Sequence, residues 1–247
     1  MGIRIGQREF SPSVFMSLLT AFCFGLFCML GNWQLQRAEL KRDIQGRFEE
    51  QLELPYEYIV LSSELNEALI YRKIRLQGAY QAEKVILLDN QVHQGVAGYH
   101  VLMPFFIDGG AKAVLVDRGW VAAGDDRAVL PSIKAPKNAQ WVKGIVTIPV
   151  IEGYRLGQVE MSGQWPQRIP YLDLSKIQQG LSFELLPYVI WQAPEMDDYY
   201  IRDWKPIWSS PEKSEAYALQ WFSFAAVVLL LFVILNFKKV SAGEPNE

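Results

Sequence analysis

The sequence contains little histidine or cysteine, and it lacks the local motifs that mark common enzyme classes. Two histidines, His93 and His100, and two cysteines, Cys23 and Cys28, occur in 247 residues. A G-x-S-x-G nucleophile elbow, a phosphate-binding glycine loop and a dinucleotide-binding fingerprint are all absent. Because the residues that usually carry catalysis are scarce, we predict that the protein is not an enzyme.

Both cysteines lie in an uncharged stretch near the N-terminus, five residues apart. Side chains with this spacing point to different sides of a helix, which argues against a shared metal. Free cysteines usually act as small apolar packing residues, and we expect that role here. Since no cysteine follows Cys28, the middle of the chain can form no internal disulfide.

Charged residues are missing from a long segment near the N-terminus. No Asp, Glu, Lys or Arg occurs between Glu9 and Arg37, a gap of 27 residues. A helix crosses the hydrocarbon layer, which is about 30 Å thick, with about 20 residues. A cleaved export signal has a shorter apolar core of about 7–15 residues and then small residues, whereas this segment ends in Trp33 and Gln34. We therefore predict a retained transmembrane helix over residues 12–33.

A second uncharged segment lies near the C-terminus. Residues 216–237 carry no charged side chain over 22 positions, and Lys238 and Lys239 follow. This pattern predicts a transmembrane helix over residues 215–237 with a cytoplasmic C-terminus, because cations gather on the cytoplasmic side. The cations around the first segment give the opposite count, but a long connection is translocated largely regardless of charge.

Two spans place both chain ends on the same side of the membrane. We therefore expect cytoplasmic tails at residues 1–11 and 238–247 and an extracytoplasmic domain at residues 34–214. In residues 38–214, 23 acidic side chains outnumber 19 basic ones, a net charge of −4. Such a domain lacks the basic stripe that nucleic-acid binding needs, so no nucleic-acid partner is expected.

The outer border of the first predicted span carries one aromatic and two cationic residues on one helix face. Trp33, Arg37 and Lys41 follow one another at intervals of four residues. The simplest interpretation is an interfacial tryptophan with cations that reach lipid headgroups.

The border of the second span looks similar, with Tyr217, Gln220 and Trp221 at helical spacing. An aromatic belt explains these residues. A sharper interpretation is that Gln34 and Gln220 form hydrogen bonds between the two spans, which model systems value at about 1 kcal/mol.

The middle of the chain reads mostly as strand. Its β-branched and aromatic runs are bounded by Gly, Asp or Pro: "YRKIRLQGAY", "KVILLD", "YHVLMPFFI", "KAVLVDRGWV" and "QWVKGIVTI". The stretch "NQVHQGVAG" between two of them predicts a hairpin loop, since its glycines permit positive φ. Helical signals continue from the first span through Gln51 and follow Ser63 and Asp173.

These elements predict an α+β membrane protein. Two transmembrane helices, one near each end, flank a mostly antiparallel β domain with a few helices. The domain is either barrel-like or a sandwich, and we favour the barrel. The Pro-containing stretch 203–211 is expected to be the linker back to the membrane.

Two local patterns leave alternatives open. His93 and His100 with Asp89 and Asp117 could form a metal site of an extracytoplasmic hydrolase, but their spacing matches no ligand motif, and polar loop residues are the simpler interpretation. In "LVDRGWVAAGDDR", Arg118 either pairs with an acid beside a bulge at Gly119, or forms a partner or cofactor surface with Trp120.

Five ordered motifs, taken together, resemble a known family. They are Gly31-x-Trp33-Gln34-x-x-Arg37-x-x-x-Lys41, "GYHVLMPF" from Gly98, "VLVDRGWV" from Val114, "VKGIV" from Val142 and "YALQWF" from Tyr217. Over nearly the whole chain the sequence is similar to the surfeit-locus (Surf/Shy type) family of cytochrome c oxidase assembly factors.

The resemblance implies a multi-pass protein of the bacterial cell inner membrane with a periplasmic domain and both termini in the cytoplasm. It implies a non-enzymatic chaperone of the respiratory chain that assembles a haem–copper oxidase, acting on the catalytic subunit around haem a insertion. The alternative is a structural or scaffold subunit of another envelope complex. Candidate partner or cofactor-surface residues are Trp33, Gln34, Arg37, Lys41, Tyr99, Arg118, Trp120, Tyr217, Gln220 and Trp221.

One position departs from the family pattern. Many members carry a histidine three residues before the Tyr-Ala of the second span, and it has been proposed as a haem ligand. The matching residue here is Ser214. A serine hydroxyl is not a usual axial ligand of haem iron, so haem a is a candidate cofactor without an assigned ligand.

Overall fold

The computed structural model describes residues 3–5, 8–108, 110–124, 126–127, 129–134, 136, 140–149, 158–194, 199–206 and 209–239. The chain divides into two compact units. A helical unit comprises Met1–Gly46 and Pro206–Glu247, and a barrel unit comprises Arg47–Lys205. Each unit is described by itself below.

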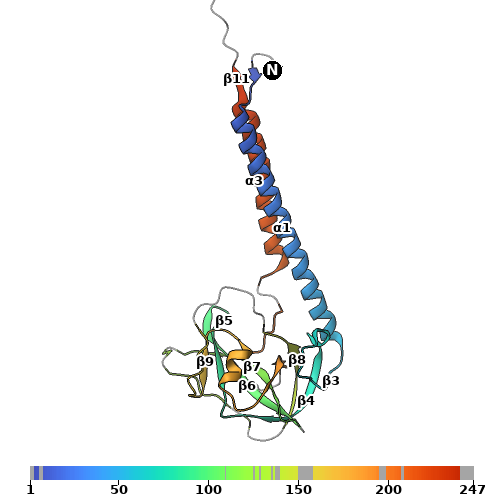
Figure 1. Ribbon diagram of the computed structural model, residues 1–247, viewed down its shortest axis with the longest axis vertical. Helices are drawn as coiled ribbons and strands as arrows, with labels where there is room; N and C mark the ends of the chain where they lie inside the picture. Colours follow the sequence, from blue (N-terminus) through green and yellow to red (C-terminus); the bar gives the residue numbers. More distant parts are fainter. Residues whose placement is uncertain are drawn as a thin grey trace, which may run out of the picture. The chain divides into compact units, whose positions relative to one another are not determined.

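Two helices that lie side by side dominate the helical unit (Figure 1). Helix α1 spans Val14–Glu53 and helix α3 spans Pro211–Asn236. Both are long and apolar enough to cross a membrane, with mean hydropathies of 2.2 and 2.5 in their most apolar windows. α1 begins after Ser13, whose hydroxyl accepts a hydrogen bond from the Met16 amide. α3 begins with a proline at its first position, where no intrahelical N–H is needed.

Small side chains line the seam between the two helices. Ala38, Ser214, Ala218 and Ala225 are each at most 4% exposed, and Gly31 is buried as well. A Cβ atom on Gly31 would lie 2.8 Å from the Phe222 ring, so the glycine lets this ring approach the α1 backbone. Close approach at small residues is how helices associate in lipid, where the hydrophobic effect does not drive them together.

A three-stranded antiparallel sheet lies where the two helices meet the chain ends. Its strands are β1 (Ile3–Ile5), β2 (Arg8–Phe10) and β11 (Phe237–Lys239), in the order β1-β2-β11. The Phe10 ring contacts Phe232 and Phe237 at centroid distances of 5.8 and 5.3 Å.

A closed ring of five strands forms the barrel unit. The strands are β4 (Lys73–Tyr80), β8 (Gln140–Thr147), β10 (Leu185–Gln192), β7 (Ala113–Ala122) and β6 (Val96–Ile107), and β6 pairs back to β4. Only the β10–β7 pair within the ring is parallel. β5 (Ile86–His93) and β9 (Gln167–Ile169) extend the sheet beyond β6, and β3 (Glu57–Tyr58) extends it beyond β4. The predicted fold class, two apolar helices flanking a mostly antiparallel barrel, is confirmed.

Strand alternation divides the buried side chains into two clusters. Successive strand residues point to opposite faces, so Val101 and Met103 of β6 face the barrel interior while Leu102 faces outward. The interior cluster includes the fully buried Tyr99 and Tyr188. The outer cluster is covered by helix α2 (Leu174–Gln179), β9 and their flanking loops.

Several local predictions can be compared with the structure. The hairpin at "NQVHQGVAG" is confirmed, but its turn is only Gln94-Gly95, with φ of 48° and 81° as a tight hairpin needs. Asp173 caps α2, since its carboxylate accepts from the Ser175 and Lys176 amides at 3.1 and 3.2 Å. The helix predicted after Ser63 is only the 3₁₀ helix η1 (Glu67–Leu69).

Candidate functional site

At the end of the helix pair near α3's first turn, polar residues of α1 and α3 meet. Lys41 donates from Nζ to the hydroxyls of Ser209 and Ser214, both at 2.8 Å. Arg42 forms an ion pair with Glu215. On the same helix, the Arg37 guanidinium lies 5.2 Å from the Trp33 ring centroid, in a cation–π arrangement. The predicted face of Trp33, Arg37 and Lys41 thus has a polar partner in α3.

The predicted glutamine pair has no such support. Within the described residues no hydrogen bond joins Gln34 to Gln220, and Gln220 is exposed. Aromatic rings connect the helices at this level instead: Phe27 stacks on Trp221 at a centroid distance of 5.8 Å. Tyr217 is 47% exposed.

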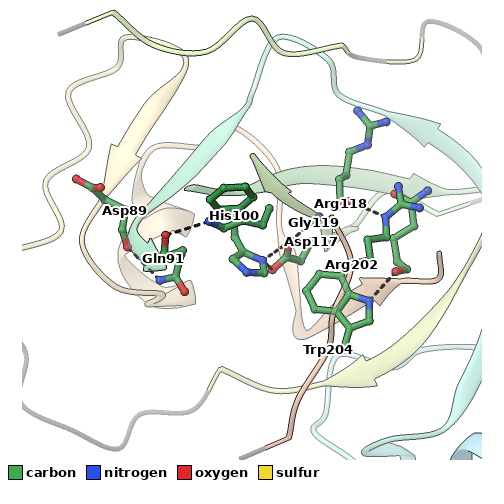
Figure 2. A network of polar contacts seen from close by, with 10 residues as sticks. Asp89, Gln91, His100, Asp117, Arg118, Gly119, Arg202 and Trp204 are labelled. Carbon is green, nitrogen blue, oxygen red and sulfur yellow. Dashed lines mark hydrogen bonds and ion pairs between the residues drawn. The ribbon is translucent and has the colours of Figure 1, made fainter. Parts of the chain in front are cut away.

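In the barrel unit, a histidine and an aspartate meet across the β6–β7 pair (Figure 2). Asp117 is 5% exposed, and its two carboxylate oxygens lie 2.9 and 3.1 Å from His100 Nδ1. The Gly119 amide donates to the same carboxylate at 3.0 Å. Since an ionised carboxylate only accepts hydrogen bonds, Nδ1 of His100 carries the proton.

Two opposing effects set the charge of His100. Burial lowers the pKa of His100, but the Coulomb attraction of Asp117 and the hydrogen bond to it together outweigh burial and raise the pKa above its ordinary value. The charged imidazolium is therefore favoured beside Asp117.

The segment 199–206, which follows β10 and leads toward α3, packs against this pair. Trp204 stacks on Trp191 at a centroid distance of 5.4 Å, and its ring also contacts the His100 ring at 5.4 Å, tilted by 42°. Its indole N–H donates to the Gln192 carbonyl at 2.8 Å. Ile201 forms a two-bond bridge with Trp120, at 2.7 and 2.9 Å. The predicted linker is thus docked on the barrel over its first part.

Arg202 anchors the segment further. It donates from Nε to the Arg118 carbonyl at 2.6 Å and from Nη1 to the Ala193 carbonyl at 2.7 Å. Gly119 makes this contact feasible: its φ is +118°, and a Cβ there would lie 2.7 Å from the Ile201 carbonyl oxygen. The pairing of β6 with β7 shifts register at this point, which confirms the predicted bulge and close approach at Gly119.

Arg118 has aromatic neighbours in place of the acid that one interpretation required. Its guanidinium lies 4.7 Å from the Tyr200 ring centroid and 5.3 Å from that of Tyr80. Its Nη1 donates to the Lys134 carbonyl, and its Nε is buried without a hydrogen bond. In the part of the chain that the structure describes, no carboxylate pairs with it.

The three candidate surface residues of the barrel unit are all buried. Tyr99, Arg118 and Trp120 are 0%, 8% and 7% exposed. Trp120 donates from its indole to the Gln91 carbonyl at 3.0 Å and packs against His93. In this structure Trp120 and Arg118 therefore hold the β5–β6 hairpin and the segment 199–206 in place, and Tyr99 belongs to the barrel core. That the three residues form a partner or cofactor surface stays a prediction.

The metal-hydrolase alternative required His93, His100 and nearby acids in one place. The structure separates them, because His93 packs on Trp120 whereas His100 bonds to Asp117. Asp89 instead lies 3.4 and 3.9 Å from the guanidinium groups of Arg127 and Arg168. Among the described residues, no group of three or more His, Cys, Asp or Glu side chains could hold a metal ion.

Sequence reasoning brought His100 and Asp117 together only in the metal-site alternative, and it missed their neighbours Trp191, Arg202 and Trp204. A signal for the His100–Asp117 pair was present, since "GYHVLMPF" and "VLVDRGWV" occupy adjacent strands. The β-bulge, however, shifts the register by one residue, so simple alternation would not have aligned the histidine with the aspartate.

Two apolar helices, each long and apolar enough to cross a membrane, flank a small, mostly antiparallel barrel in the sequence. This arrangement defines the class of protein. Within that class the chain belongs to the SURF1 family, whose model matches residues 21–226. The match therefore covers most of both helices and the whole barrel unit.

Two relatives are similar to the chain. The cytochrome oxidase assembly protein SHY1 of Saccharomyces cerevisiae is 28% identical over 120 residues, which cover 47% of this chain and 30% of that protein. A SURF1-like protein of Rickettsia felis is 24% identical over 234 residues, which cover 91% of this chain and 98% of that protein. The chain thus spans under a third of the yeast relative and nearly all of the rickettsial one.

Proposed function

We propose that the protein is a non-enzymatic assembly factor for a haem–copper oxidase of the bacterial inner membrane, acting on the catalytic subunit around haem a insertion. The observation that carries the proposal is membership of the SURF1 family over residues 21–226, together with the name of the yeast relative, a cytochrome oxidase assembly protein. The helices would span the membrane over residues 12–33 and 215–237. Residues 34–214 would lie in the periplasm, and the tails 1–11 and 238–247 in the cytoplasm.

The exposed residues of the helix pair are the proposed contact surface for the oxidase subunit. Trp33 and Tyr217 are 48% and 47% exposed, and Arg37 and Gln220 are exposed too. Trp and Arg are the residue types most often found at the energetic centres of interfaces. In lipid, such a surface would meet a partner's transmembrane helices at headgroup level.

The position that matches the family's histidine does not fit a haem ligand. Ser214 is 4% exposed, and its hydroxyl already accepts a hydrogen bond from Lys41. A hydroxyl held in this way offers iron no axial donor of the usual kind. We therefore assign haem no ligand here, and we propose that the protein acts by contact with the oxidase subunit.

Affinity purification in a mild detergent tests the proposal. We expect the full chain to retain the catalytic oxidase subunit, and Trp33→Ala to weaken retention by about 2 kcal/mol, roughly thirtyfold, as for a central interface tryptophan. Trp141→Ala is a matched control, because Trp141 is 52% exposed and also lies under an arginine, with the Arg75 guanidinium 5.6 Å from its ring.

The outcome separates the proposal from its alternative. Recovery of a different envelope complex, with no oxidase subunit, would favour a structural or scaffold role. Equal loss of the oxidase subunit in both tryptophan variants would show that Trp33 has no specific part in the contact.

A further inference from the structure

Three cations at one end of the helix pair have no acidic partner among the described residues. They are Arg37, Lys41 and Lys213, and the charges that act most strongly on Lys41 are those of the other two. Of the two acids in the first turns of α3, Glu215 forms an ion pair with Arg42, and Glu212 interacts most strongly with the Ser210 hydroxyl and more weakly with Arg42.

The acids of α1 do not neutralise this group either. Glu39 and Asp43 are each two residues from Lys41, which places them about half a turn around the helix from it. An excess of positive charge therefore stays on one face.

Lys41 is held in place with donor capacity to spare. An ammonium group has three N–H donors, and two of them bond to Ser209 and Ser214. Among the described residues the third has no partner, so it can donate to a ligand. Because both serine hydroxyls accept from Lys41, their own protons are free to donate as well. Exposed Arg37 and Lys213 add charge beside this donor set.

The group lies at the level that lipid headgroups occupy. Headgroup layers add about 5–8 Å on each side of the hydrocarbon. Lys213 is three residues from Ala216, where the uncharged part of α3 begins, a distance of about 4.5 Å along the axis. In the proposed orientation these cations lie on the side of the membrane where flanking Lys and Arg are usually depleted. General topology therefore does not account for them.

We propose that Arg37, Lys41 and Lys213, with the hydroxyl of Ser209, form a binding site for the phosphate of an anionic phospholipid headgroup. The ammonium and hydroxyl donors would bond to phosphate oxygens while the acyl chains lie along the apolar part of the helix pair. The site rests on the proposed membrane placement but not on any contact with an oxidase.

Lipid binding to the purified full chain tests the site in the absence of oxidase. The chain in mild detergent is titrated with dioleoyl phosphatidylglycerol or dioleoyl phosphatidylcholine, and bound lipid is counted by native mass spectrometry. We expect tighter binding of the anionic lipid, and a loss of about fivefold for Lys41→Gln or Lys213→Gln, as for one cation near an anionic surface. Lys41→Arg should retain binding.

Two controls guard against a structural explanation. The Lys213 ammonium forms no hydrogen bond or ion pair with any described residue, so Lys213→Gln tests charge without disturbing the seam. Arg47→Gln removes an exposed cation further along α1 and should leave binding unchanged. The proposal would be overturned if the chain bound the two lipids equally. It would also be overturned if Lys41→Gln and Lys213→Gln both bound the anionic lipid as tightly as the wild type. Displacement of the lipid by millimolar inorganic phosphate would also overturn it, since a soluble anion would then be the ligand.

Discussion

Replacing Gly78 by alanine would place a methyl group where β4 meets β6 and closes the barrel. A Cβ atom there would lie 1.9 Å from the Phe106 carbonyl oxygen and 2.9 Å from the Phe105 ring. The Phe106 carbonyl belongs to the backbone and cannot rotate away as the end of a side chain can. The added methyl group must therefore push β4 and β6 apart. The closing pair holds only three residue pairs, from Gly78↔Ile107 to Tyr80↔Phe105.

The cost follows from what that separation breaks. One or two backbone hydrogen bonds are worth about 1 kcal/mol each, and the edge-on contact of Tyr80 with Phe105, at 4.9 Å, adds about 0.5–1.5 kcal/mol. With overpacking, we expect a loss of about 2–4 kcal/mol. For a unit of about 160 residues this lowers the Tm by about 4–16 °C.

Thermal unfolding of the full chain in detergent, followed by tryptophan fluorescence, measures this shift. Gly46→Ala is the matched control, because nothing lies within 4 Å of a Cβ at that helical position. It should raise stability slightly, by about 0.5–1 kcal/mol. A Gly78→Ala protein that unfolds within about 1 °C of the wild type would refute the closed barrel.

Three further predictions concern single contacts. Because the pKa of His100 is raised in the folded state, the charged His100 contributes its full stabilisation below about pH 6.5, and this contribution is lost as the pH rises through the folded-state pKa. When the free energy of unfolding is measured over a pH series, Asp117→Asn should abolish this pH dependence. Gly31→Val should lower the Tm of the helix pair, at a cost of about 1–3 kcal/mol, whereas Gly25→Val, with open space around it, should not. Asp173→Ala should cost about 1 kcal/mol in urea unfolding, because α2 loses its N-cap.

Much of the fold could be predicted because local patterns and tertiary structure agree. The β-branched runs became β4 to β8, and most of each uncharged stretch lies in α1 or α3. The sequence analysis missed strand β10 because it contains Pro187, which has no backbone N–H to donate to a neighbouring strand. In the structure this proline lies at a register shift between Leu185 and Val189. Barrel closure through Gly78 joins distant segments and leaves no local signal.

The candidate site was predicted less well than the fold. The sequence left two interpretations of Arg118 and Trp120 open, a strand with a bulge at Gly119 and a partner or cofactor surface, since both residue types are common at interfaces. They are buried because the segment 199–206 returns to pair with Trp120, about eighty residues away in sequence, a contact that no periodicity reveals. At the helix border, spacing did place Arg37 and Lys41 on one face, but the serine partners, Ser209 just before α3 and Ser214 within it, required the three-dimensional structure.

The central claim is that this protein assembles a haem–copper oxidase, and deletion of its gene tests that claim most directly. Reduced-minus-oxidised spectra of membranes would measure haem a, and oxidation of cytochrome c would measure activity. We expect both to fall in the deletion strain and to return with the intact chain. Unchanged haem a content and oxidase activity in the deletion strain would contradict the claim.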